Sequence, residues 1–191
     1  MNLPNKLTVF RMLLVPVIIV LCIFPVGGSW NIWGQVLPIN QFIVVMLFIV
    51  ASLTDFLDGQ IARKQNIITT FGKFMDPIAD KLLVNSLIII LACTSKIHMI
   101  VPLIMISRDL VVDAIRLLAS QNNVVLAASQ LGKAKTFTQM LGIIFILLNN
   151  IPFCFLGVRI DLITMAAATL ISLISGIDYF MKNRQFILES M

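Results

Sequence analysis

Six apolar runs dominate the sequence and limit the folds that it can adopt. They cover approximately residues 8–24, 41–53, 72–92, 99–119, 131–149 and 162–181. A helix needs about 20 residues to cross the hydrocarbon core of a bilayer. The second run is shorter, but its helix is expected to continue past the lipid core to Arg63. The runs therefore predict an all-α integral membrane protein with six transmembrane helices.

Composition excludes a soluble protein with a single core. The chain has 191 residues, of which 59% are hydrophobic and 12% are charged, whereas soluble domains average about 25% charged residues. No second domain is visible, so residues 1–191 are expected to form one membrane domain. A short interfacial segment with Lys6 and Arg11 is expected before the first span. Residues 25–40 carry two tryptophans and are expected to form a loop at the membrane surface.

The basic residues are placed asymmetrically along this predicted topology. Twelve of the 14 fall on the side of the two termini, and only Lys96 and Arg159 fall on the other side. The positive-inside rule therefore predicts a multi-pass protein of the cell membrane with both termini in the cytoplasm. Nucleic-acid binding is disfavoured, because the basic residues form no soluble patch. The three cysteines lie in separate apolar runs and match no zinc or redox motif.

Four aspartates stand out in this apolar chain. Asp55 and Asp58 are three residues apart, and Asp76 and Asp80 are four apart, so each pair lies on one face of its helix. A short turn joins the two helices, which makes them antiparallel neighbours whose acidic faces can converge. Carboxylates so close together would repel, and divalent cations relieve that repulsion. Hard oxygen ligands favour magnesium, manganese or calcium over zinc, and four of them can hold two ions.

Small residues and one arginine accompany the aspartates. Gly59, Ala62 and Gly72 leave bare backbone beside the predicted metal site, which lets a helix or a flat ligand approach. Packing alone also explains such glycines. Arg63 can neutralise a phosphate. Metals, small residues and an arginine together indicate a substrate that contains a pyrophosphate.

The joint pattern Asp-x2-Asp-Gly-x2-Ala-Arg-x8-Gly-x3-Asp-x3-Asp resembles the signature of the CDP-alcohol phosphatidyltransferase family at every specified position. Residues 2–8, with Arg11 and Pro16, resemble the amino-terminal segment of the family's phosphatidylglycerophosphate synthases. Residues 107–109 with Arg116, and residues 131–136 with 139–140, resemble them too. Two residues depart from the family pattern, since Asp109 replaces an expected glutamate and Gln60 a common aromatic residue.

The resemblance implies roles for individual residues. Asp55, Asp58 and Asp76 would bind two Mg²⁺ or Mn²⁺ ions, and Asp80 would bind one of them and act as the general base. The donor, CDP-diacylglycerol, would be bound by residues of the amino-terminal segment and of the signature region: Asn5, Thr8, Gly59, Ala62, Arg63, Thr69 and Gly72. The resemblance also implies six helices around a polar cavity open to the cytoplasm, and a homodimer.

The acceptor follows from the remaining cations. Arg108, Arg116, Lys133 and Lys135 lie near the cytoplasmic ends of the fourth and fifth spans, where an anionic acceptor needs them. We therefore expect transfer to sn-glycerol 3-phosphate, which gives phosphatidylglycerophosphate and CMP. Alternatives in the family are phosphatidylglycerol, as in a cardiolipin synthase, and inositol phosphate. A divalent-cation carrier is the alternative outside it, but the acids of spans two to four lie toward the cytoplasmic side rather than at mid-membrane.

Separate roles for the aspartates give the first testable prediction. Asp80→Asn should abolish CMP release and leave CDP-diacylglycerol binding largely intact, because the amide cannot accept the acceptor's proton. Asp55→Asn or Asp76→Asn should weaken Mn²⁺ binding as well as activity. Binding of donor and metal is measured on each purified variant by calorimetry. Wild-type turnover in Asp80→Asn would exclude this residue as the base.

Overall fold

The computed structural model describes residues 2–24, 27–64, 70–121, 124, 126 and 129–188. Within them, the side chains of residues 3–4, 55–64, 70–71, 73–74 and 186–188 are not described. The elements in chain order are α1 (Leu3–Ile23), β1 (Ser29–Ile32), β2 (Gln35–Pro38), α2 (Ile39–Lys64), α3 (Thr70–Cys93), α4 (Ile100–Gln121), α5 (Gln130–Leu147), the short 3-10 helix η1 (Ile151–Leu156) and α6 (Ile160–Leu188).

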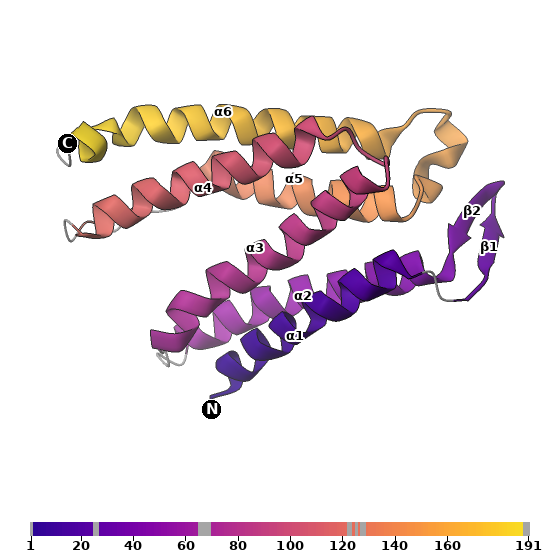
Figure 1. Cartoon of the computed structure of the whole chain (residues 1–191), viewed down its shortest axis with the longest axis horizontal. Helices are drawn as coiled ribbons and strands as arrows, with labels where there is room; N and C mark the ends of the chain where they lie inside the picture. The colour runs from indigo at the N-terminus through magenta and orange to yellow at the C-terminus, as the bar shows by residue number, and fades with distance from the viewer. Residues whose placement is uncertain are drawn as a thin grey trace.

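The helices form two groups that α3 connects. Helix α1 packs against α2 and α3, and α6 packs against α5 and α4. Helix α3 also contacts α4 and α5, so it lies between the two groups (Figure 1). The start of α1 and the end of α6 lie at one end of the molecule, and the β-hairpin lies at the other (Figure 1).

All six apolar runs form helices, as predicted, but the expectation of a loop without strands at residues 25–40 was wrong. Helix α1 begins at Leu3, with Pro4 in its first turn, so the expected interfacial segment is the first part of this helix. The expected loop at residues 25–40 contains an antiparallel hairpin in which Ile32 pairs with Gln35. Trp33 and Gly34 have positive φ angles of 50° and 79°, which is the backbone of a two-residue hairpin turn. The fold is therefore mainly helical rather than all-α.

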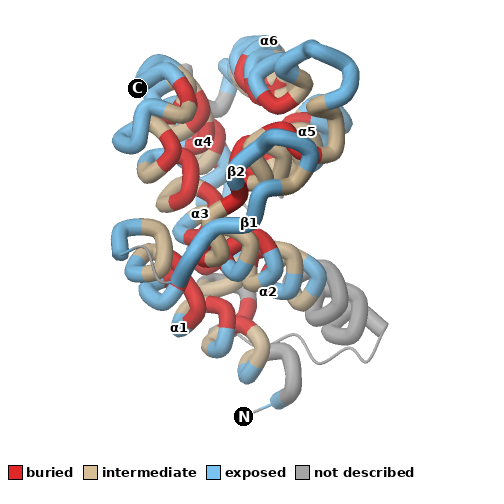
Figure 2. Tube along the Cα trace, turned by 90° about the vertical axis from the view of Figure 1, so that its right-hand side faces the viewer, coloured by how far each residue is buried: buried red, intermediate tan, exposed pale blue. Residues whose placement is uncertain are grey.

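A continuous apolar core holds the two groups together. Phe48 of α2, Leu87 of α3, Met105 of α4 and Ile143 of α5 are fully buried in one cluster. Figure 2 shows the buried residues on the inner faces of the helices and exposed residues on their outer faces. Because the core includes residues from both groups, it fixes the relative positions of the helices that carry the polar residues.

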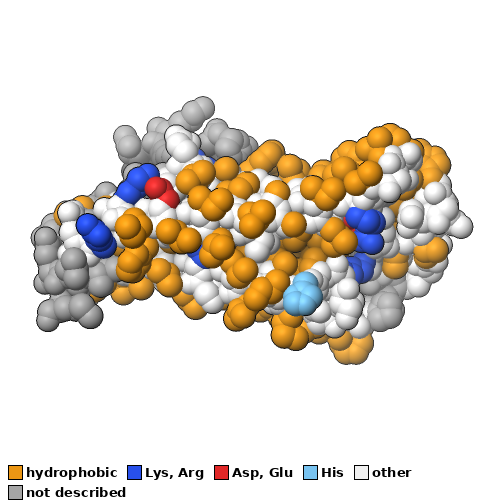
Figure 3. Space-filling view, turned by 90° about the horizontal axis from the view of Figure 1, so that it is seen from above, with side chains coloured by type: hydrophobic (Ala, Val, Ile, Leu, Met, Phe, Trp, Pro, Cys, Tyr) orange, Lys and Arg blue, Asp and Glu red, His pale blue; other side chains and the backbone are white. Residues whose placement is uncertain are grey.

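The outer surface is also apolar. Leu103, Leu110 and Leu117, seven residues apart along α4, are each more than 60% exposed. Hydrophobic side chains cover the middle of the face shown in Figure 3, and lysines and arginines lie toward its two ends. Among the described residues, two helical segments, Asn5–Ile23 and Ile160–Gln185, are long and apolar enough to cross a membrane. Exposed apolar surface of this extent is typical of a lipid-facing protein.

Candidate active site

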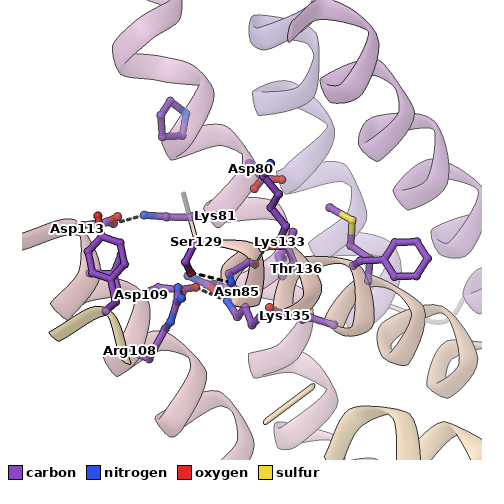
Figure 4. A pocket seen from close by; sticks show the side chains of 18 of the residues that line it. Asp80, Lys81, Asn85, Arg108, Asp109, Asp113, Ser129, Lys133, Lys135 and Thr136 are labelled. Carbon is purple, nitrogen blue, oxygen red and sulfur yellow. Dashed lines mark hydrogen bonds and ion pairs between the residues drawn. The ribbon is translucent and has the colours of Figure 1, made fainter. Parts of the chain in front are cut away.

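A polar pocket of about 650 Å³ lies between α3, α4, α5 and α6 (Figure 4). The four residues expected to bind the acceptor lie on the fourth and fifth predicted spans. In the structure they line this pocket together with the predicted general base. The residues concerned are Asp80 on α3, Arg108 and Arg116 on α4, and Lys133 and Lys135 on α5. The sequence placed these residues near one membrane face, and the structure brings them around one cavity.

A buried carboxylate organises the floor of the polar pocket. Asp109 is 9% exposed, and both of its oxygens are used. Lys135 Nζ donates to Asp109 Oδ2 at 2.7 Å, and Arg108 Nη1 donates to Asp109 Oδ1 at 3.0 Å. A buried charge is tolerated only when it is paired in this way. Lys135 lines the pocket, but it is 4% exposed and its ammonium group is bound by Asp109.

Sequence reasoning missed residues that line the pocket, Lys81, Asp113 and Tyr179, and one residue behind it, Ser175. Lys81 forms an ion pair with Asp113 at its edge. Ser175 accepts a hydrogen bond from Arg108 Nη2, and the Tyr179 hydroxyl accepts one from Arg116 Nε at 3.2 Å. In the sequence, Ser175 and Tyr179 are distinguished only by their spacing of four residues, which places both on one face of the sixth predicted helix.

The described lining of the polar pocket carries an excess of positive charge. Its cations outnumber its carboxylates by five to three. The cations are Lys81, Arg108, Arg116, Lys133 and Lys135, and the carboxylates are Asp80, Asp109 and Asp113. The amino-terminal end of α5, capped by Ser129, lies at the same cavity. A helix amino terminus and surplus cations both favour an anionic ligand.

The predicted metal ligands are divided between α2 and α3. Asp76 and Asp80 are both partly buried on α3. Thr8 of α1, which is 1% exposed, donates from Oγ1 to Asp76 Oδ1 at 2.5 Å. Asp55 and Asp58 lie in α2, which packs against α3, and their side chains are outside the described set.

Only three of the predicted donor-binding residues are described together with their surroundings, Asn5, Thr8 and Gly72. Asn5 lies on α1 and is partly exposed, and Gly72 is buried on α3. The side chains of Ala62 and Arg63 on α2 are not described, nor are the surroundings of Gly59, and Thr69 lies outside the described residues.

The described part of the predicted metal-ligand set fits a divalent ion. Among the described side chains, no three acidic, histidine or cysteine groups converge, and the side chains of Asp55 and Asp58 lie outside the described set. The described part of the set consists of two aspartates one helical turn apart, Asp76 and Asp80, with Asp76 held by Thr8. Carboxylate oxygens are the ligands that Mg²⁺ and Mn²⁺ prefer, so the residues present fit these ions.

Comparison with known proteins adds independent information. Residues 1–175 match the family described as CDP-alcohol phosphatidyltransferase. A protein of Bacillus subtilis (strain 168) named CDP-diacylglycerol–glycerol-3-phosphate 3-phosphatidyltransferase is 37% identical over 183 residues, which cover 95% of each chain. Proteins with the same name from Rickettsia bellii (strain RML369-C) and Wigglesworthia glossinidia brevipalpis are 36% and 32% identical. The alignment with the Rickettsia protein covers 97% of each chain. The alignment with the Wigglesworthia protein covers 94% of this chain and 93% of the relative.

The ion pairs of Asp109 make a stability prediction. Asp109→Ala should lower the free energy of unfolding by about 3 kcal/mol, because Lys135 would remain as a buried charge without its partner. The double variant Asp109→Ala, Lys135→Met should recover part of that loss. Lys182→Ala is the control, since it removes the exposed pair with Asp178 and should change stability little. Stability is measured by denaturant unfolding in detergent, and equal effects of Asp109→Ala and Lys182→Ala would contradict the assignment.

Proposed function

Since the chain belongs to the CDP-alcohol phosphatidyltransferase family, we propose that it transfers the phosphatidyl group of CDP-diacylglycerol to sn-glycerol 3-phosphate. The products are phosphatidylglycerophosphate and CMP. The names of the relatives describe this reaction. The observation that carries the proposal is that the polar pocket combines Asp80 with a surplus of cations.

Charge favours a phosphate monoester as the acceptor. Like the phosphate of a phosphorylated side chain, such a group carries a charge of about −1.5 to −2 near neutral pH. The cations that line the polar pocket exceed the carboxylates by two. A neutral alcohol would leave this surplus uncompensated, and a phosphodiester such as phosphatidylglycerol would offset only one charge. Inositol phosphate is also a monoester, and only an acceptor panel separates it from glycerol 3-phosphate.

Asp80 is proposed as the general base. It lines the polar pocket beside the acceptor cations, so an acceptor bound there presents its hydroxyl to this carboxylate. The hydroxyl oxygen forms a bond to the lipid-side phosphorus, the bond from that phosphorus to the CMP oxygen breaks, and the hydroxyl proton passes to Asp80. Holding both reactants in this geometry supplies a large part of the acceleration.

The four aspartates are proposed to hold two Mg²⁺ or Mn²⁺ ions. Asp55 and Asp58 would contribute from α2, and Asp76 and Asp80 from α3. When bound, such ions neutralise charge that develops on the leaving nucleotide. Thr8 would orient Asp76 through its hydrogen bond. The donor contacts implied by the family resemblance, at Asn5, Thr8, Gly59, Ala62, Arg63, Thr69 and Gly72, remain part of the proposal.

The membrane topology belongs to the same proposal. We propose that all six α-helices cross the bilayer as one domain, with the polar pocket and both termini at the cytoplasmic face. Two observations support this orientation. The start of α1 and the end of α6 both lie away from the β-hairpin (Figure 1), and the lysines and arginines are distributed asymmetrically along the sequence. The homodimer rests on the family resemblance, and crosslinking in native membranes tests it.

An acceptor panel tests the proposed reaction. Purified protein with CDP-diacylglycerol and Mg²⁺ should release CMP with glycerol 3-phosphate and much less with phosphatidylglycerol or neutral alcohols. Arg116→Ala should raise the KM for glycerol 3-phosphate about tenfold, the order of one charge-assisted hydrogen bond, with little change in the KM for CDP-diacylglycerol. Lys182→Ala is the matched control on the surface. No CMP release with any acceptor would favour the carrier hypothesis instead.

The Thr8–Asp76 hydrogen bond gives a prediction about metal affinity. Thr8→Val preserves the shape of the side chain but removes the donor, so the Mn²⁺ concentration needed for half-maximal activity should rise about fivefold. Thr8→Ser retains the hydroxyl donor, so this variant should keep the wild-type value. The stabilisation of the substrate-free protein by Mn²⁺, read as a shift in Tm, should change in the same order. Thr138→Val is the control, since among the described residues Thr138 donates its hydrogen bond to the carbonyl of Ala134 in its own helix. Equal metal responses of Thr8→Val and the wild type would exclude this role.

A further inference from the structure

Three residues of α6 lie against the two arginines of the polar pocket. Ser175 and Tyr179 are four residues apart, so they occupy one face of the helix, and they are 0% and 4% exposed. Arg108 and Arg116 are eight residues apart on α4, which packs against α6. Arg108 donates a hydrogen bond to Ser175, and Arg116 donates one to Tyr179.

Gly176 allows Arg108 to pass close to the backbone of α6. A Cβ atom at this position would lie 2.7 Å from Cγ of Arg108, which is closer than real contacts allow. Beyond this passage, Nη2 donates to Ser175 and Nη1 donates to Asp109. Each end of the guanidinium group therefore has a fixed partner, and its direction is determined by α4 and α6 together.

Tyr179 supports Arg116 in a different way. The guanidinium carbon of Arg116 lies 5.6 Å from the centroid of the tyrosine ring, and Nε donates to the hydroxyl. Arg116 itself is exposed, whereas the ring is buried against Val112 and Ile115. A rigid ring thus holds a long, mobile side chain at the mouth of the polar pocket.

We infer that Ser175, Gly176 and Tyr179 are positioning residues that aim Arg108 and Arg116 at the phosphate of the acceptor. This inference rests on the proposed function, and it adds α6 as the element that sets specificity for a phosphorylated acceptor. The physical reason is preorganisation, because an arginine that is already held in place loses less conformational freedom when its ligand binds. None of the three residues needs to touch the acceptor.

Single substitutions on α6 give the first measurement. Gly176→Ala, Ser175→Ala and Tyr179→Phe should each raise the KM and the Kd for glycerol 3-phosphate about threefold to tenfold, the size of a lost or misdirected hydrogen bond. The KM for CDP-diacylglycerol should stay near the wild-type value. Ser172→Ala is the matched control: Ser172 is also fully buried on α6, one turn earlier, and its hydroxyl has no hydrogen-bond partner among the described residues.

A double-mutant cycle separates positioning from general packing. If Gly176 acts through Arg108, then Gly176→Ala should have no further effect on the KM for glycerol 3-phosphate in an Arg108→Ala background. Tyr179→Phe should likewise have no further effect in an Arg116→Ala background. Effects that add in both cycles would overturn the inference. If Gly176→Ala fails to fold, the Tyr179 cycle decides, because phenylalanine retains the packed ring.

The two proposals can fail separately. If the wild-type protein binds glycerol 3-phosphate but releases no CMP, the proposed reaction is wrong, and the positioning role is still judged from the Kd values measured by calorimetry. If the wild-type protein is active and the α6 variants change neither Kd nor KM, only the positioning role is wrong. A Kd that weakens in all three α6 variants and not in Ser172→Ala supports the inference in either case.

Discussion

The polar half of this structure depends on one buried carboxylate. Asp109 lies in a helix whose outer face is covered by exposed leucines, and its charge is tolerated because Lys135 and Arg108 each donate to one of its oxygens. These contacts join α4 to α5 at the floor of the polar pocket. Arg108 then extends the network to α6 through Ser175. The positions of three helices around the cavity are therefore coupled to one charge.

This network divides the basic residues of the pocket by role. Lys135 is buried and Lys81 is paired with Asp113, so both are committed to protein carboxylates. Arg116 and Lys133 are exposed and line the pocket, whereas Arg108 is partly buried. These five cations look equivalent in the sequence but differ in how much of their charge a ligand can use. The difference comes from burial, which makes a charge costly unless a protein partner compensates it.

Helix α3 connects the two functions of the proposed site. Asp76 faces the amino-terminal helix through Thr8, and Asp80, one turn later, lines the polar pocket. The proposed metal and donor region therefore lies toward α1 and α2, and the proposed acceptor region lies between α4, α5 and α6. Because α3 contacts both groups of helices, it places the proposed base between the proposed donor region and the proposed acceptor region.

The sequence by itself determined the features that depend on local spacing. The apolar runs predicted the six helices that the structure contains. The separations of Asp55 from Asp58 and of Asp76 from Asp80 predicted two acidic faces, and the uneven lysines and arginines predicted an orientation. Only the tertiary structure decided which faces meet. Thr8 bonds to Asp76 across 68 positions, Arg108 to Ser175 across 67, and Lys135 to Asp109 across 26. Periodicity defines the faces of a helix, but the pairing of those faces is fixed by how the whole core packs.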